Sequence, residues 1–82
     1  MSERSEGTFT LDTRGLICPL PVIRTQERIK TLDDGALLDV VATDPGALHD
    51  IPAWCRVHGH DVVETFRAER DIHVVVRVQR AS

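Results

Sequence analysis

The sequence of 82 residues has few aromatic side chains and no basic excess. Its aromatic residues are Phe9, Trp54 and Phe66, and it contains no tyrosine. Ten Lys and Arg residues face thirteen Asp and Glu residues, which gives a formal net charge of −3. Proteins that grip nucleic acid through its backbone usually carry a basic excess, and many single-strand binders stack bases on aromatic side chains. We therefore expect no direct binding to nucleic acid.

The sequence also lacks an apolar run long enough to cross a membrane and a segment typical of a secretory signal. Residues 1–7 are polar and mixed in charge, and we interpret them as a flexible tail. The length allows one small domain, which we place at residues 8–80. We expect a cytoplasmic protein that does not act at a membrane, in which Cys18 and Cys55 are reduced thiols.

Alternating and helical patterns succeed one another along the domain. The helical spacing of Val22, Ile29 and Leu32 predicts a helix that begins near Pro19 and ends at residues 33–35. Period-two alternation predicts four strands, at residues 8–12, 36–43, 60–67 and 72–79. The alternation is least regular in the third of these segments.

A second helical region follows the second strand. Asp44 suits the N-cap of this helix, and Pro45 suits its first turn. Pro52 lies inside the region, where its missing N–H should kink or restart the helix. We expect Asp50 to cap the restarted piece and Gly59 to follow the last helical residue.

The order of elements is β-α-β-α-β-β. Right-handed crossovers place both helices on the same face of one sheet. We therefore predict an α+β fold, a two-layer α/β sandwich with a four-stranded mixed sheet whose other face is partly open to water. The first three strands should run parallel if both crossovers are standard, and the last strand should return antiparallel. The segment 36–43 is apolar on both faces, so we place it centrally in the sheet.

Cys18 lies where a strand gives way to a helix. The N-terminus of a helix carries a partial positive charge and unpaired N–H groups, which lower the pKa of a thiol and make it nucleophilic. Pro19 and Pro21 have no N–H, so the amides of Cys18 and Leu20 are the candidates to face the sulfur. Arg14, in the preceding loop, adds a positive charge. We predict that Cys18 is a reactive thiol rather than a buried small hydrophobe.

Two residues near Cys18 in the sequence, Asp12 and Leu20, each have two interpretations. Asp12 either opposes the charge of Arg14 or orients its side chain. Leu20 falls about 160° from Val22 on a helical wheel, so it should point away from the core and lie beside the thiol. An exposed leucine there is either ordinary surface or a docking contact.

The run 11–21 reads Leu-Asp-x-Arg-Gly-Leu-x-Cys-Pro-x-Pro, and it resembles the signature of the TusA/SirA sulfur-carrier family. The resemblance continues at residues 44–45, 50–55 and 59–60, in matching order and spacing. It covers nearly the whole chain, from Phe9 to Arg80. The fold that this resemblance implies is the same β-α-β-α-β-β sandwich.

The resemblance implies that Cys18 accepts sulfane sulfur as a persulfide and passes it to the thiol of an acceptor protein. The implied donor is a cysteine desulfurase or a rhodanese-type enzyme, and the implied acceptors are relay proteins for tRNA thiolation, sulfur oxidation or cofactor assembly. Exchange between thiols needs no cofactor and no metal. We expect a monomer that forms transient complexes. The residues expected to stabilise the sulfur or to dock partners are Arg14, Gly15, Pro19, Leu20, Pro21, Asp44 and Pro45.

The chain departs from one branch of the family at two positions. Members of the tRNA-thiolation branch often carry a basic residue before the cysteine and an acidic residue between the two prolines. Ile17 and Leu20 occupy these positions here. The departure argues against the tRNA pathway and leaves the carrier chemistry in place.

Cys55 admits other roles. A disulfide with Cys18 is not expected, because Cys55 lies about ten residues along the second helical region, or about 15 Å, and a disulfide needs Cα atoms within about 7 Å. A zinc site formed by Cys55, His58 and His60 with Cys18 or His49 has no recognised ligand spacing. We therefore assign Cys55 to the core. The alternative function for the whole chain is a non-catalytic regulatory module that binds RNA or protein on the same fold.

Overall fold

The computed structural model describes residues 8–79. Residues 1–7, which we interpreted as a flexible tail, lie outside the described residues, as does residue 80 at the end of the predicted domain. Among residues 8–79, no helix is long and apolar enough to span a bilayer. The elements are β1 (Thr8–Thr13), α1 (Leu20–Ile29), β2 (Leu37–Ala42), α2 (Ala47–His58), β3 (Asp61–Ala68) and β4 (Asp71–Arg77).

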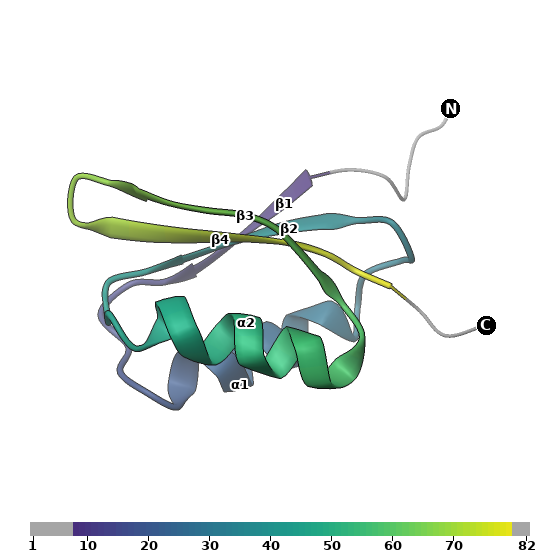
Figure 1. The fold of residues 1–82 in the computed structure, drawn as a ribbon, viewed down its shortest axis with the longest axis horizontal. Coiled ribbons are helices and arrows are strands. Elements are labelled where there is room, and N and C mark those ends of the chain that lie inside the picture. The colour runs from purple at the N-terminus through teal and green to yellow at the C-terminus, as the bar shows by residue number, and fades with distance from the viewer. Residues whose placement is uncertain (1–7, 80–82) are drawn as a thin grey trace.

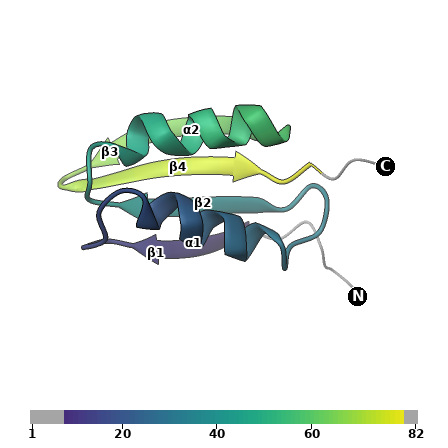
Figure 2. The same ribbon diagram turned by 90° about the horizontal axis from the view of Figure 1, so that it is seen from below.

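The four strands form one mixed sheet in the order β1-β2-β4-β3. β1 pairs with β2 in parallel, and β4 pairs antiparallel with both β2 and β3. The first three strands therefore point the same way and β4 points the opposite way, as predicted. β2 lies inside the sheet, as its two apolar faces indicated, and β4 lies between β2 and β3 (Figure 2).

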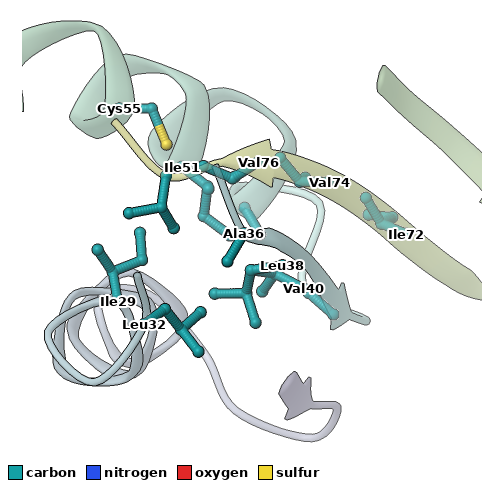
Figure 3. Close-up of a cluster of buried hydrophobic side chains, with 13 residues drawn as sticks. Ile29, Leu32, Ala36, Leu38, Val40, Ile51, Cys55, Ile72, Val74 and Val76 are labelled. Carbon is teal, nitrogen blue, oxygen red and sulfur yellow. The ribbon is translucent and has the colours of Figure 1, made fainter. Parts of the chain in front are cut away.

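Both helices cover the same face of the sheet, which confirms the two-layer sandwich (Figure 1). α1 packs against β1 and β2, and α2 packs against β3 and β4 (Figure 2). The core fills the space between the layers, and Figure 3 shows side chains from α1, α2, β2 and β4 converging there. The fully buried strand residues are Thr13, Leu38, Val40, Ala42, Ile72, Val74 and Val76.

Helix α1 begins one residue later than predicted and ends three residues earlier than its apolar stripe. Pro19 is the N-cap residue, and Pro21 falls in the first turn, where its missing N–H leaves no unmade bond. The buried side chains are Pro21, Thr25 and Ile29, whereas Val22 is only half-buried. The Thr25 hydroxyl donates to the Pro21 carbonyl at 2.8 Å, which allows a polar side chain to sit in the core.

Helix α2 is a single continuous helix with Pro52 inside it, so the predicted restart of the helix at Pro52 is wrong. The N-cap residue is Gly46 and not Asp44, whose backbone carbonyl instead accepts an N–H in the turn before the helix. A proline inside a helix removes one backbone hydrogen bond. Ile51 and Cys55 on either side of Pro52 are both fully buried, and this packing against the sheet outweighs the lost bond.

A β-bulge explains the irregular alternation of the third strand. The register of β3 against β4 shifts between Val62 and Glu64, which inserts one extra residue. Val62 packs against the core, while the rest of β3 forms an exposed edge of the sheet. On the face away from the helices, the Phe66 ring stacks on the His73 ring with centroids 4.5 Å apart.

Candidate functional site

The β1–α1 and β2–α2 connections lie together at one end of the molecule (Figure 1). Parallel neighbouring strands bring the segments that follow them to the same edge of a sheet. Two hydrogen bonds join the connections here. The amide of Gly15 donates to the Thr43 hydroxyl at 2.9 Å, and the amide of Cys18 donates to Asp44 Oδ2 at 2.8 Å. Cys18 is exposed in this setting.

The thiol of Cys18 has acidic neighbours. Its Sγ donates a hydrogen bond to Oδ2 of Asp50, in the first turn of α2, at 3.0 Å. The other acid, Asp44, accepts the Cys18 amide with Oδ2 and the Gly46 amide with Oδ1 at 3.3 Å. A Cβ placed on Gly46 would lie 3.6 Å from Oδ2 of each aspartate, so the two carboxylates converge on the turn before α2.

These neighbours raise the pKa of the Cys18 thiol above its ordinary value. The hydrogen bond to Asp50 is the largest cause, followed by desolvation and by the negative charges of Asp50 and Asp44. The prediction of a lowered pKa is therefore wrong. The amides that we expected to face the sulfur are both engaged elsewhere, since that of Cys18 donates to Asp44 and that of Leu20 donates to the Ile17 carbonyl at 2.9 Å.

The charge of Arg14 is paired with two carboxylates, neither of which contacts the thiol. Its Nε and Nη2 donate to the two carboxylate oxygens of Asp12 at 2.9 and 3.0 Å, and its Nη1 lies 3.7 Å from Asp71 Oδ2. Both interpretations of Asp12 hold, because its carboxylate offsets the charge of Arg14 and fixes the position of the guanidinium. The guanidinium lowers the pKa of Asp12 to about 2 through these hydrogen bonds. Arg14 thus ties the β1–α1 connection to the start of β4.

The other predicted site residues differ in how far they are exposed to solvent. Pro21 is fully buried, so its ring is not available to a docking partner and instead belongs to the core. Asp44 is half-buried, in keeping with its two amide contacts. The predicted residues that are exposed around Cys18 are Arg14, Gly15, Pro19, Leu20 and Pro45.

Leu20 is part of an exposed apolar patch, which we define as Ile17, Leu20 and Ile23. The exposed fractions of these side chains are 69%, 38% and 44%. Leu20 and Ile23 are three residues apart on α1 and therefore share a face, and the Leu20 amide is bonded to Ile17. The patch adjoins Cys18 in the chain, so a protein that approaches the thiol meets apolar side chains next to it.

The contact of Asp50 with the thiol was not predicted, because an aspartate two residues before Pro52 is typical of a helix cap. Asp44, which we predicted both as a helix cap and as a site residue, binds the Cys18 amide through its carboxylate. The order of the elements in the chain could have indicated that these two acids lie near Cys18. Both acids open the segment that follows β2, and β2 is the parallel neighbour of the strand that leads to Cys18.

Cys55 belongs to the core, as predicted. Its side chain is fully buried, and Figure 3 shows its sulfur on α2 near Ile51. Burial raises the pKa of this thiol to about 11. Both cysteines are free thiols, and only Cys18 is exposed. Within residues 8–79, no three His, Cys, Asp or Glu side chains are grouped so that they could hold a metal ion.

Comparison with known protein families identifies the family to which this chain belongs. The profile of the family described as sulfurtransferase TusA matches residues 9–78. The chain belongs to the TusA family. A TusA sulfur carrier protein from Pseudomonas aeruginosa is 46% identical over 54 residues, which are 66% of this chain and 68% of that protein. The TusA sulfur carrier protein of Allochromatium vinosum is 33% identical over 67 residues, which are 82% of this chain and 88% of the relative.

The TusA fold is shared with a solved structure. A SirA-like protein from Desulfitobacterium hafniense superposes with a TM-score of 0.76 at 20% identity, over 88% of this chain and 99% of that one. Some TusA relatives are longer proteins. The match spans 36% of one relative from Bacillus subtilis and 36% of another from Aquifex aeolicus.

Proposed function

We propose that the protein is a cytoplasmic sulfur carrier in which Cys18 holds sulfane sulfur as a persulfide. The observation that carries the proposal is the exposure of Cys18 at the family's Cys-Pro-x-Pro element, together with the burial of Cys55. Of the two thiols, only Cys18 is open to a partner protein. The names of the TusA relatives as sulfur carriers support the same chemistry.

The proposed uptake step is an exchange between a thiol and a persulfide. The thiolate of Cys18 attacks the terminal sulfur of a donor persulfide R–S–SH, and a new S–S bond forms on Cys18. The S–S bond of the donor breaks, and its electron pair and a proton leave with the donor as R–SH. Atoms and electrons balance without an oxidant, a metal or an organic cofactor.

The surface around Cys18 supports transfer between proteins. The donor that we propose is a cysteine desulfurase or a rhodanese-type enzyme, and the acceptor is a relay protein of a sulfur pathway. Both would dock over the end of the sheet that carries the thiol and the apolar patch. The patch includes Ile17 and Leu20, which favours acceptors in sulfur oxidation or cofactor assembly over those in tRNA thiolation. We propose a monomer that meets its partners in transient complexes.

Intact-mass measurement after incubation with a cysteine desulfurase and L-cysteine tests the proposal. We expect the wild type to gain the mass of one sulfur atom and to lose it again on reduction. Cys18→Ser should gain none, whereas Cys55→Ser, the matched control, should gain sulfur as the wild type does. Sulfur on Cys18→Ser, or none on the wild type, would contradict the carrier role. The wild type without sulfur is the result that a non-catalytic binding module predicts.

A further inference from the structure

Negative charge dominates the surroundings of the proposed carrier thiol. Asp50 receives the hydrogen bond from Cys18 Sγ at 3.0 Å, and Asp44 binds the amide of the same residue at 2.8 Å. The cation that could offset them is Arg14, but its guanidinium is paired with Asp12 and Asp71. A negative charge placed on Cys18 therefore faces carboxylates from α2 and from the β2–α2 connection.

The empty and loaded forms of the carrier respond differently to this arrangement. The empty Cys18 is a neutral thiol at neutral pH, and its S–H donates to the Asp50 carboxylate. A terminal persulfide is a stronger acid than a thiol, so at a given pH the loaded Cys18 carries more negative charge than the empty one. Loading therefore exchanges a hydrogen bond to Asp50 for repulsion between two negative charges.

We propose that Asp50 promotes the release of sulfur by stabilising the empty Cys18 thiol and repelling the charged persulfide. The inference rests on the proposed carrier function and assigns one residue the control of how long the sulfur stays. A carrier needs such control because sulfur bound too firmly does not move on to the acceptor. Asp50 suits this task better than Asp44 because its carboxylate contacts the sulfur itself.

Release is an exchange between the loaded carrier and the thiol of an acceptor. The acceptor thiol first gives its proton to the persulfide, and the acceptor thiolate then attacks the terminal sulfur of Cys18–S–SH, so that the S–S bond of the carrier breaks. The electron pair of that bond stays on Cys18, which takes up the proton that the acceptor thiol gave up on ionising. Cys18–S–S⁻ and R–SH thus become Cys18–SH and R–S–S⁻, and the restored S–H donates again to Asp50.

Exchange with glutathione persulfide tests the inference without a partner protein. Wild type, Asp50→Asn, Asp50→Glu and Asp33→Asn would be equilibrated with set ratios of glutathione persulfide to glutathione, and the loaded fraction read by intact mass. Asp33→Asn is the matched control, since it removes the same charge from an exposed turn at the opposite end of α1. The rate of alkylation of Cys18 by iodoacetamide against pH provides a second readout.

Asp50→Asn should shift the exchange equilibrium toward the loaded form by about fivefold, the ratio that corresponds to two unit charges about 4 Å apart in water. It should also lower the pH at which Cys18 becomes reactive to iodoacetamide. Asp50→Glu and Asp33→Asn should behave like the wild type. If Asp50→Asn does not fold, Asp50→Ser carries the same expectation, because it also removes the charge.

The outcomes separate the two proposals. A wild type that never gains sulfur overturns the carrier function. A wild type that loads on Cys18, with Asp50→Asn loading to the same extent, overturns the role of Asp50 alone. An equal gain of loading in Asp33→Asn also overturns that role, because it would show that net charge, and not the contact with the thiol, sets the equilibrium.

Discussion

Thr13 connects the end of β1 to the site, and its substitution by valine provides a direct test of the structure. Its side chain is 0% exposed, and its hydroxyl donates to the Val41 carbonyl of β2 at 2.8 Å. The Thr13 carbonyl accepts the Leu16 amide at 3.2 Å, which begins the turn toward Cys18. Thr13→Val keeps the shape of the side chain and removes only the donor.

The expected loss of stability follows from two opposing effects. Removing the donor from a buried carbonyl costs about 1–3 kcal/mol. Burying a methyl group in place of the hydroxyl returns about 1 kcal/mol. We expect Thr13→Val to be destabilised by about 1 kcal/mol, which lowers the Tm by about 5 °C for a domain of this size.

Urea unfolding followed by far-UV circular dichroism measures this change. The midpoint should fall while the slope of the transition stays constant, because the surface exposed on unfolding is unchanged. Thr13→Ser, which keeps the hydroxyl and loses the methyl, is the matched control for packing. A Thr13→Val variant as stable as the wild type would refute the reasoning, since the buried hydrogen bond would then make no net contribution.

Three further predictions concern the core, the buried thiol and the end of α2. Ile51→Ala should destabilise the protein by about 3 kcal/mol in urea unfolding, because Ile51 is fully buried between α2 and the sheet; a loss below about 1 kcal/mol would contradict that packing. In a Cys18→Ser background, the free energy of unfolding should fall by about 2 kcal/mol as the pH rises from about 9 to about 11. The unfolded Cys55 thiol ionises first and the folded one only near pH 11, so Cys55→Ala should lack this decrease. Gly59→Ala should lower stability by about 1–2 kcal/mol in thermal unfolding, because Gly59 ends α2 at φ 82°; an unchanged Tm would contradict that conformation.

The fold was predictable from the sequence where local patterns agree with tertiary packing. The alternation of Ile72, Val74 and Val76 predicted the buried face of β4, and these side chains are buried, as is Val78 just after the strand. The continuity of α2 through Pro52 was less predictable. Pro52 breaks a helix in isolation, but its effect here is set by neighbours that are buried against the sheet, and sequence alone does not give the extent of that packing.

The position of the candidate site was predictable, but its electrostatics were not. The Cys-Pro-x-Pro element located an exposed cysteine correctly. A lowered pKa of Cys18 would require unpaired amides at the start of α1, whereas the Cys18 amide binds Asp44 from another connection. The contact between Cys18 and Asp50 spans 32 positions of sequence, so it depends on which strands are neighbours. Helical and alternating periodicities carry no information about such a contact.

The position of β4 in the sheet has a consequence for folding while the chain is being synthesised. β4 joins the β1–β2 pair to β3, yet it is the last of these four strands to be synthesised. Until residues 71–77 leave the ribosome, β2 presents an unpaired backbone edge and β3 has no neighbouring strand. Such edges attract strands from other chains. The four-stranded sheet therefore cannot form before β4 has been synthesised, and a sheet formed earlier would present open edges on which aggregation can begin.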